Sequence, residues 1–542
     1  MPRHIIAAAL AAALAFAVRA LPAHSEETTM TETAAASPLA EYDRPVRPGG
    51  VNGQEFWNGR ARFFMYAPAF DFRPIDGAAR YRFEVVDDLH ERHSFEADAP
   101  TAALSPVWGS LPTGYVTVTC QALDGDGKAL GACGERTFWK SAPFMAGSYP
   151  PAARGYAESA RMVYRYLLDF PSNRHLRETG EPGTAYAKNY FISEMYAGLI
   201  RAMVHYAQID GADREQAMAT ARRAADFLLS ISEPADAPLA HFPPTYLNAP
   251  AQFEGQTMLI YPAVAAKSYL LLGEATGEEK YIQAAVNIAE TYLKLQGEDG
   301  TWPLRLMAKD GSPAGDNRLL PIDCVIPLME RLHARTGDPR YRHCADRAFA
   351  YVENGPLKTW NWEAQFEDTE LTAKFQNMGH QDADDTALYL LRRFPGDPRR
   401  LAQAEEILRF AEDQFVCWEA PWKGRRLPSD LREGFWSKDT DNWHTPAVVE
   451  QFDCRWPIDS CAGKLLVPCL ALHRATGDGR WLQKARALAD SMTQMVQPDG
   501  RLPTWWIQPD HAGNDWHYNM IQSAEALEEL DEFLKTTDDK EN

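Results

Sequence analysis

Residues 277–300, GEEKYIQAAVNIAETYLKLQGEDG, and residues 477–500, GDGRWLQKARALADSMTQMVQPDG, have the same length and the same plan. Each begins with a glycine that follows a threonine, continues with apolar residues at helical spacing, and ends in Asp-Gly. A proline and a tryptophan follow both copies within a few residues. Two such copies indicate an internal repeat, and repeats of this kind are typical of folds built from stacked helical units.

The turn that opens each copy recurs along the chain. It is found at Thr276-Gly277, Thr336-Gly337-Asp338 and Thr476-Gly477-Asp478, while Asp210-Gly211 and Pro395-Gly396-Asp397 occupy similar places. Each turn ends one apolar helical segment and opens another, so each is expected to join the two helices of a hairpin.

Twelve helices are expected after residue 150. Their predicted starts lie near Ala153, Tyr190, Arg214, Thr257, Glu279, Asp323, Pro339, Asp382, Pro398, Asp459, Gly479 and Asp515. Twelve helices make six hairpins, and alternating short and long connections predict that residues 150–537 close into an all-α (α/α)6 toroid whose inner helices line a cavity. An open solenoid such as a tetratricopeptide array is the alternative, but its repeats are shorter and more uniform.

Residues 41–147 show the period of two that is typical of half-buried strands. Tyr81, Phe83 and Val85 alternate with polar neighbours, and the run Trp108–Cys120 resembles a strand edge of immunoglobulin-like or fibronectin-like modules. The segment is therefore predicted to be a small all-β sandwich. A hairpin turn is expected at Asp124–Gly127, where the remaining ligand positions of a calcium loop are missing.

The N-terminus has the layout of a secretory signal. Arg3 and His4 precede an apolar run, Ile5–Val18, and small residues follow it. We predict a signal peptide at residues 1–25, a disordered linker at 26–40, and export to the periplasm or the extracellular space. An apolar first helix is the alternative, but the alanine-rich stretch that follows offers it nothing to pack against.

Composition excludes some partners. A formal net charge of −20 argues against a nucleic-acid surface, because binding phosphates requires clustered cations. After the signal no apolar run is long enough to span a membrane. The eight cysteines contain no C-x-x-C pair, which argues against a structural zinc site. Cys120 and Cys133 flank the expected hairpin, either as a disulfide or as unpaired thiols.

The six long connections of the toroid should share one face and carry the binding groups. They run roughly through 171–189, 232–256, 297–322, 354–381, 416–458 and 497–514 and are rich in tryptophan, whose flat rings suit sugar rings, although most single tryptophans are core residues. Arginines there could grip an acidic sugar or pair with nearby aspartates. The substrate-binding candidates are Trp302, Arg318, Trp443, His444, Arg455, Trp505, Trp506, Trp516 and His517.

Carboxylates recur where inner helices should begin. Pro321-Ile322-Asp323 and Pro457-Ile458-Asp459 are near-copies, and His380-Gln381-Asp382-Ala383-Asp384-Asp385 stands at the corresponding place between them. Helix capping explains any one aspartate. If all point into one cavity, however, their pKa values must differ, and one would serve as an acid. The catalytic candidates are Asp382, Asp385, Asp323, Asp459 and His380; a metal site is the less favoured use of the same residues.

The hairpin repeat with acidic inner-helix starts resembles the (α/α)6 glycosidases, which include unsaturated glucuronyl hydrolases and related uronide-acting enzymes. This resemblance covers roughly residues 150–535 and implies that aspartates at the cavity rim act as acid and base, with Asp323, Asp382, Asp385 and Asp459 matching by position. An immunoglobulin-like module before a toroid is also similar to one family of inverting cellulases. Its Asp-Ala-Gly-Asp motif is absent here, because Asp382-Ala383-Asp384-Asp385 lacks the glycine.

We therefore predict a glycoside hydrolase that cleaves oligosaccharides or polysaccharides containing uronic acid, with two carboxylates and no cofactor. The runner-up is a lyase or a uronyl epimerase, since such enzymes rely on tyrosine and histidine, and Tyr246, Tyr518, His444 and His517 are available. A third hypothesis is a sugar-binding protein without catalysis. The sequence leaves the sugar, the linkage and the oligomeric state open.

Overall fold

The computed structural model describes residues 39–47, 56–209, 211–248, 253–363, 373–419, 445–452, 455–506, 509–511 and 513–541. Contacts divide the chain into a first unit, Met1–Ala40, and a second unit, Glu41–Asn542. The described strands and α-helices all belong to the second unit. The predicted signal peptide and all but the last two residues of the predicted linker lie outside the described residues.

Helices account for most of the described chain after residue 150, and each long helix begins within four residues of a predicted start. The long helices are α2 (Tyr156–Asp169), α4 (Ile192–Tyr206), α5 (Arg214–Ser230), α6 (Tyr261–Thr276), α7 (Glu279–Leu295), α8 (Val325–Thr336), α9 (Pro339–Asn354), α11 (Gln381–Arg393), α12 (Pro398–Phe415), α13 (Asp459–Thr476), α14 (Gly479–Met495) and α15 (His517–Glu541). Shorter helices are α1 (Ser105–Trp108), α3 (Pro171–Thr179), α10 (Pro356–Thr359) and two 3-10 turns at Ala40–Asp43 and Trp57–Gly59. In the part of the chain that is described, no helix combines the length and the apolar character that crossing a membrane requires.

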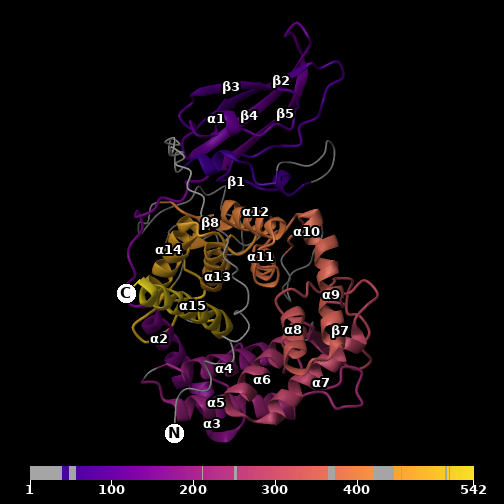
Figure 1. Cartoon of the computed structure of the whole chain (residues 1–542), viewed down its shortest axis with the longest axis vertical. Coiled ribbons are helices and arrows are strands. Elements are labelled where there is room, and N and C mark those ends of the chain that lie inside the picture. The colour runs from indigo at the N-terminus through magenta and orange to yellow at the C-terminus, as the bar shows by residue number, and fades with distance from the viewer. Residues whose placement is uncertain are drawn as a thin grey trace, which may run out of the picture. The chain divides into compact units, whose positions relative to one another are not determined.

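The hairpins close into a ring. The inner helices are α4, α6, α8, α11, α13 and α15, and each packs against one outer helix. The last helix, α15, contacts both α13 and α4, and its outer partner is α2, so the two ends of the helical region complete the circle (Figure 1). Between α8 and α11 the circle is closed by Glu330, which accepts a hydrogen bond from Tyr389 and forms an ion pair with Arg393. The predicted toroid is thus present, and the open solenoid is wrong.

The three Thr-Gly turns, two of which continue with aspartate, are built alike. In each of the three, the threonine hydroxyl donates to the carbonyl four residues earlier, at 2.7–2.8 Å, and the glycine has a φ of 72–74°. Asp338 and Asp478 then accept the backbone N–H groups of Arg340 and Arg480. The threonine ends one helix, the glycine reverses the chain in the left-handed region, and the aspartate caps the next helix.

The Asp-Gly ends of the two sequence copies are also equivalent. Gly300 and Gly500 have φ values of 89° and 92°. A Cβ at Gly300 would collide with the backbone oxygen of Arg347 in α9, and one at Gly500 would collide with that of Met162 in α2. Each of these turns therefore lies directly against the backbone of another outer helix, which leaves room only for glycine.

Gly500→Ala is expected to lower the free energy of unfolding by about 1–2 kcal/mol for the left-handed backbone and by about 1–3 kcal/mol more for the collision. Gly477→Ala is the matched control, because its φ is 72° but no atom lies within 4 Å of the added Cβ. Urea unfolding of the two variants measures the difference. Equal losses would show that the contact with α2 is not tight.

A five-stranded sheet precedes the ring. Its strand order is β1-β5-β4-β2-β3, with β1 parallel to β5 and the other pairs antiparallel. The strands are β1 (Phe63–Phe64), β2 (Arg80–Val86), β3 (Arg92–Ala97), β4 (Gly114–Leu123) and β5 (Ala129–Lys140). Asp124 accepts the N–H groups of Asp126 and Lys128 in the β4–β5 turn, as a hairpin requires, and Cys120 and Cys133 beside it are unpaired and buried.

The predicted β-sandwich is wrong in one respect, because the described residues 56–140 form one sheet and not two facing sheets. The buried face of the sheet is covered by α1 and by an extended segment instead. The ring centroids of Phe70 and Trp108 lie 5.5 and 6.1 Å from that of Phe138. The ring centroid of Phe72 lies 6.4 Å from that of Phe83. Prolines interrupt the extended segment and prevent ladder pairing. The alternation of polar and apolar residues along a strand shows which face of the sheet is buried, but it does not show which residues cover that face.

The sheet and the ring belong to the same compact unit and are joined by buried polar contacts. Asp413 of α12 accepts the backbone N–H groups of Met65 and Tyr66, and Gln414 donates to the carbonyl of Phe63 in β1. Burial raises the pKa of Asp413 to about 7. The strand β1 is therefore anchored directly to an outer helix of the ring.

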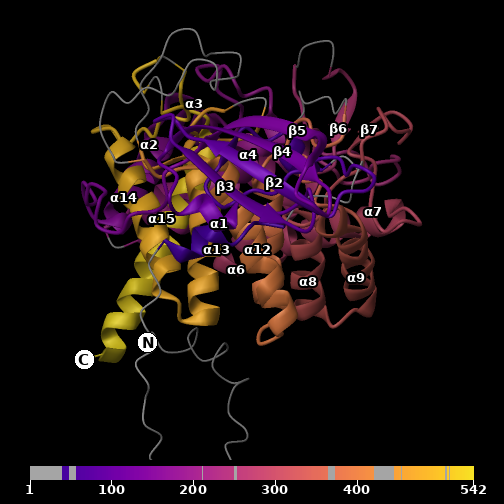
Figure 2. The ribbon, with the colours of Figure 1, turned by 90° about the horizontal axis from the view of Figure 1, so that it is seen from above.

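Long connections and short turns lie at opposite ends of the ring helices. Figure 2 shows the helices from the side, with β6 and β7 at one end and the turn between α8 and α9 at the other. The strands β6 (Gln256–Met258) and β7 (Arg305–Met307) pair with each other, as do β8 (Val416–Cys417) and β9 (Ala447–Val448). All four come from long connections, so the N-terminal ends of the inner helices face the connection side.

Candidate functional site

The inner helices enclose a cavity with two compartments. The mouth, of about 110 Å³, lies at the N-terminal ends of the inner helices, and the chamber, of about 710 Å³, extends toward their C-terminal ends. Four residues line both compartments and are called the neck: Asp323, Lys464, Tyr518 and Gln522. The neck is thus assembled from α13, α15 and the residue that shortly precedes α8.

Carboxylates dominate the mouth. Glu194, Asp323, Glu363, Asp382 and Glu450 line it, and among the described lining residues Lys464 is the basic side chain that faces them. They come from separate helices and connections that the ring brings together. Helix N-termini favour negative charge, which lowers the cost of placing so many acids together. The mouth therefore suits a ligand rich in hydroxyl groups that can donate hydrogen bonds.

Asp382 and Asp385 lie on the first turn of α11 and face different compartments. Asp382 lines the mouth and Asp385 lines the chamber. Burial, together with the nearby charge of Asp323, raises the pKa of Asp382 well above its usual value. Burial also raises the pKa of Asp385, but Lys464, whose Nζ lies 3.4 Å from Asp385 Oδ2, opposes that shift. Asp382 is thus the carboxyl best placed to hold a proton at the mouth.

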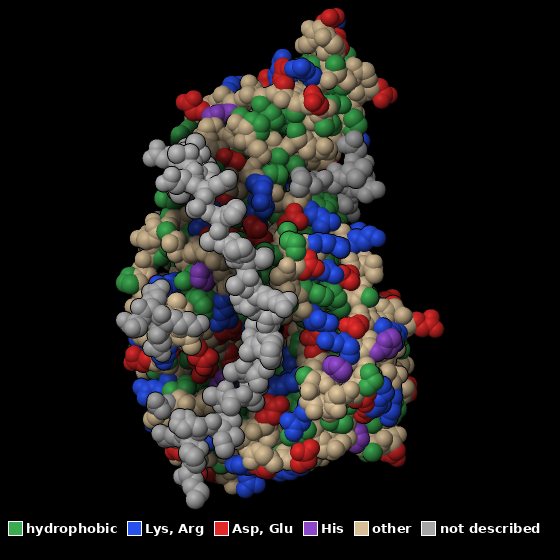
Figure 3. Space-filling view, in the orientation of Figure 1, with side chains coloured by type: hydrophobic (Ala, Val, Ile, Leu, Met, Phe, Trp, Pro, Cys, Tyr) green, Lys and Arg blue, Asp and Glu red, His purple; other side chains and the backbone are tan. Residues whose placement is uncertain are grey.

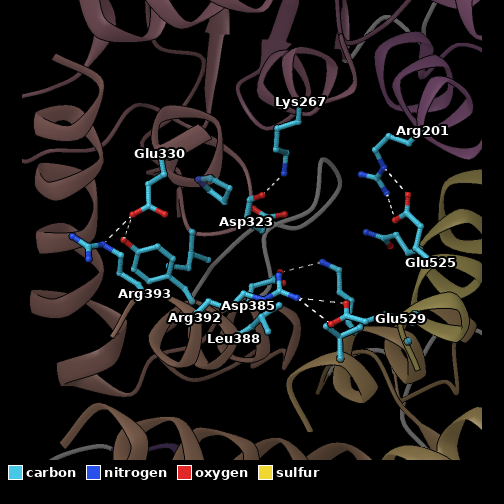
Figure 4. A pocket seen from close by; sticks show the side chains of 18 of the residues that line it. Arg201, Lys267, Asp323, Glu330, Asp385, Leu388, Arg392, Arg393, Glu525 and Glu529 are labelled. Carbon is cyan, nitrogen blue, oxygen red and sulfur yellow. Dashed lines mark hydrogen bonds and ion pairs between the residues drawn. The ribbon is translucent and has the colours of Figure 1, made fainter. Parts of the chain in front are cut away.

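Asp323 lines the same mouth as Asp382 and stays partly exposed. Its backbone oxygen accepts a hydrogen bond from Lys267 of α6, as Figure 4 shows. Burial lowers the pKa of Lys267, while the charge of Asp323 counteracts that effect. The two predicted acids Asp323 and Asp382 therefore lie together, which is the arrangement that acid and base catalysis needs.

Ion pairs between inner helices line the chamber. Arg201 of α4 makes a two-bond pair with Glu525 of α15, at 3.0 and 2.8 Å, and its guanidinium lies 5.4 Å from the Tyr518 ring. Arg392 pairs with Glu529, and Glu330 pairs across to α11 (Figure 4). Burial raises the pKa of Tyr518 to about 12, so its phenol keeps its proton at neutral pH.

Two catalytic candidates lie outside the cavity. Asp459 is fully buried and accepts a hydrogen bond from Ser523 at 3.1 Å, at the start of α13. His380 is also fully buried, with Nδ1 2.6 Å from Asp384 Oδ2. Both predictions fail because their side chains point into the packing between helices. There Asp459 has the helix-start role that was the alternative, and His380 pairs with Asp384 within the first turn of α11.

Two predicted sugar platforms are core residues. Trp302 is fully buried and donates from Nε1 to the carbonyl of Tyr292 at 2.9 Å. Trp506 is 2% exposed. Neither ring presents a face to the cavity, so both predictions are corrected. Burying a large ring between a connection and its helix stabilises the fold by about 1.5–3 kcal/mol, which accounts for their presence there.

The two predicted arginines bind elsewhere. Arg318 forms an ion pair with Asp299 at 2.6 Å, within its own connection. Arg455 donates to the carbonyl of Gln414 at 2.8 Å and lies 3.9 Å from the ring of Phe63 in β1. Neither is among the described residues that line the mouth or the chamber, so the idea that they grip an acidic sugar stays a prediction. Arg318 instead has the aspartate partner that was the alternative.

Trp505 and Trp516 are the predicted platforms that stay half-buried. Their rings lie 5.8 and 4.8 Å from the ammonium of Lys188, which donates to the carbonyl of Gly513. Trp516 also donates from Nε1 to Glu194, a lining residue of the mouth, at 3.3 Å. Trp516 therefore lies next to the mouth. The candidates Trp443 and His444 lie outside the described residues.

His517 is buried and does not line the cavity, which corrects its predicted role. Its ring stacks on Tyr186 at 3.9 Å and meets Phe170 edge-on at 4.5 Å. Burial lowers its pKa to about 3. The side chain therefore acts as a neutral aromatic residue in the packing at the start of α15.

His517 should make the fold sensitive to acid. Its pKa is 6.5 in the unfolded chain and about 3 in the folded one, so protons bind the unfolded state first and stability is lost as pH falls from 6.5. The loss attributable to one group approaches 1.4 kcal/mol per pH unit. In urea unfolding between pH 7 and 4, His517→Phe should lose less stability than the wild type, whereas a substitution at the exposed His343, His343→Gln, should not differ from it. Parallel losses in all three proteins would contradict this assignment.

Several lining residues were missed. Glu194 stands in the first turn of α4, the place that Asp382 occupies in α11, so comparing inner-helix starts could have found it. Lys267 and Lys464 each interrupt a long apolar run of an inner helix, which is a signal for a charge turned toward a cavity. Glu363 and Glu450 lie in connections with no periodicity, and no pattern marks Glu363.

The described residues contain no group of three or more histidine, cysteine, aspartate or glutamate side chains arranged to hold a metal ion. Figure 3 shows basic and acidic side chains interspersed on the face that it presents, without a continuous basic surface.

No family model matches this chain, and no curated protein does. Solved structures resemble it at low identity. A family 76 glycoside hydrolase from a bovine Bacteroides thetaiotaomicron strain is 10% identical, with a TM-score of 0.46, over 84% of this chain and 93% of that one. An unsaturated glucuronyl hydrolase specific for heparin is 12% identical, with a TM-score of 0.45, over 70% and 98%.

A cellobiose 2-epimerase from Spirochaeta thermophila is 12% identical, with a TM-score of 0.47, over 71% of this chain and all of that one. At these identities and TM-scores the likeness carries no argument about the reaction. The ring of this chain is established by its own helix contacts.

Proposed function

We propose that this protein is a carbohydrate-active enzyme that hydrolyses glycosidic bonds at the mouth of the ring, with Asp382 as general acid and Asp323 as general base. The observation that carries the proposal is that these two carboxyls line the same mouth while burial and the charge of Asp323 raise the pKa of Asp382. A carboxyl that keeps its proton beside a second carboxyl is the kind of pair that glycoside hydrolysis uses.

The roles of the two carboxyls as acid and base follow from the raised pKa of Asp382. Asp382 holds a proton at a pH where an ordinary aspartate has lost it, and it can pass that proton to the oxygen of the leaving sugar. Asp323 accepts a proton from the attacking water. As pH rises through the raised pKa of Asp382 the acid is lost, so activity should fall on the alkaline side.

The surroundings support a sugar ligand. The remaining carboxylates of the mouth can accept hydrogen bonds from hydroxyl groups, and the half-buried ring of Trp516 lies beside them, bonded to Glu194. We propose a neutral sugar rather than a uronic acid at the mouth, because Lys464 is the basic side chain among its described lining residues. Five acidic side chains line the mouth among the described residues, and their ionised members would disfavour a carboxylated sugar.

The lyase alternative is less well supported. His517 lies outside the cavity, and Tyr518, which lines the neck, has its pKa raised to about 12 by burial, opposite to what a base needs. Export remains a prediction that rests on residues 1–25.

Incubation with a panel of neutral and uronic oligosaccharides tests the proposal. New reducing ends without ultraviolet absorbance would support hydrolysis, and neutral substrates should be preferred. An unsaturated, absorbing product would indicate a lyase, while calorimetric binding without any product would indicate a sugar-binding protein. Either result would overturn the proposal.

A further inference from the structure

Lys464 is an unusual residue for its position. It is the one charged side chain between Ser460 and Leu472 of α13, a helix that is buried along most of its length. Its side chain is 16% exposed and lines both the mouth and the chamber. Burying an ammonium group costs several kcal/mol, on the order of the penalty for any isolated ion, unless carboxylates offset it.

The partners of Lys464 are the acids of the neck region. Its Nζ lies 3.4 Å from Asp385 Oδ2, so it makes a direct ion pair with a carboxylate of α11. Burial lowers the pKa of Lys464, but the charges of Asp385 and Asp323 more than offset that effect and raise it above its usual value. The ammonium therefore stays charged between the two compartments.

Every inner-helix element around Lys464 contributes a titratable group. These are Arg201 of α4, Lys267 of α6, Asp323 before α8, Asp382 and Asp385 of α11, and Tyr518 and Glu525 of α15. Arg201 and Glu525 neutralise each other, and Tyr518 keeps its proton. The charges that act most strongly on Asp382 and Asp385 are then those of three carboxyls, Asp323, Asp382 and Asp385, and of two lysines, Lys267 and Lys464. Glu194, Glu363 and Glu450 also line the mouth.

These groups cannot all be ionised at equal cost, since like charges in a buried site oppose one another. Lys464 is bonded to Asp385, and Lys267 lies against the backbone of Asp323. Asp382 has no cation paired with it among the described residues. A proton shared by the three acids is therefore held best on Asp382.

We propose that Lys464 is a positioning residue that keeps Asp385 as a carboxylate at the neck and thereby leaves Asp382 as the group that carries the catalytic proton. The inference rests on the proposed function for its catalytic meaning, but the distribution of protons is a property of the protein alone. Lys464 acts through Asp385 and needs no contact with the sugar.

Removing the positive charge of Lys464 should shift the pKa values of the neighbouring aspartates in a predictable direction. Lys464 lowers the pKa of both Asp382 and Asp385, so Lys464→Met should raise both. The rise should be about one unit or more for Asp385, whose carboxylate lies 3.4 Å from Lys464 Nζ. Lys464→Arg keeps the charge and should restore values near those of the wild type. In the double variant Lys464→Met/Asp385→Asn the lost positive and negative charges offset each other, and the pKa of Asp382 should return toward its wild-type value.

Carboxyl carbon NMR of protein labelled at aspartate reads these values directly, with Asp382→Asn and Asp385→Asn identifying the two signals. Unchanged pKa values in Lys464→Met, or values in Lys464→Arg that differ from the wild type as much as those of Lys464→Met, would overturn the inference. If Lys464→Met does not fold, the arginine and double variants carry the same test, and a double variant whose Asp382 titrates far from the wild-type value contradicts it.

Turnover gives an independent reading. The alkaline limb of the pH–rate profile should move upward in Lys464→Met by the shift that the NMR titration measures for Asp382, whereas a merely structural role would lower kcat without moving the limb. If the wild type cleaves no sugar, the proposed function fails while the NMR titration still decides the role of Lys464.

Discussion

Asp382→Asn is expected to lower turnover by about 10²–10⁴-fold with the fold intact. The amide has the size of the carboxyl but cannot give a proton to the leaving sugar. Within the described residues the Asp382 side chain forms no ion pair, so little structure depends on it. Steady-state kinetics on the preferred oligosaccharide, with a thermal scan of each protein, measures both parts of the prediction.

The matched control is Asp346→Asn, an exposed aspartate on the outer helix α9. It should change neither kcat nor the unfolding temperature. An Asp382→Asn enzyme that keeps turnover within a few-fold of the control would remove this residue from the mechanism, and a large drop in unfolding temperature would point to a structural role instead.

Glu412→Gln is expected to cost about 3 kcal/mol of unfolding free energy, at the lower end of what breaking a buried ion pair costs. Glu412 is 2% exposed, accepts hydrogen bonds from Tyr66 and Trp418, and lies 2.7 Å from Nζ of Lys484, which is itself buried. In the glutamine variant the remaining carboxylate near Lys484 is that of Glu41, whose Oε1 lies 3.8 Å from Lys484 Nζ. The contact between the sheet and the ring should loosen first.

Glu405→Gln on the same helix is the control, because Glu405 pairs with Arg44 at 3.5 Å on the surface, where such a pair contributes about 0–1 kcal/mol. Urea unfolding gives the free energies, and hydrogen exchange at β1 reports whether the sheet detaches. Equal losses for the two variants would mean that the buried cluster around Glu412 adds nothing beyond a surface pair.

The ring could be predicted because its signals are local. A threonine that ends a helix, a glycine in the left-handed region and an aspartate that caps the next helix each leave a mark in the sequence, and Gly337 and Gly477 both have that role. The cover of the sheet could not be predicted, because the residues that pack on Phe138 come from an extended segment and a short helix with no periodicity.

The site was predictable only in part. Asp323 and Asp459 follow the same Pro-Ile pair, yet Asp323 lines the neck while Asp459 is closed off by Ser523 from α15. The local sequence before the two aspartates is the same, so contacts with residues distant in the sequence decide which of them lines the cavity. The buried tryptophan Trp302 was mistaken for a platform for the same reason, since a large ring suits both a core and a sugar.

Hydrolysis in ¹⁸O-labelled water tests most directly whether Asp382 and Asp323 act on a glycosidic bond. We predict that the wild type places one labelled oxygen at the new reducing end of a neutral oligosaccharide, and that Asp382→Asn and Asp323→Asn do so at a rate lower by orders of magnitude. An unlabelled product from the wild type, or labelling at the wild-type rate in both variants, would contradict the mechanism.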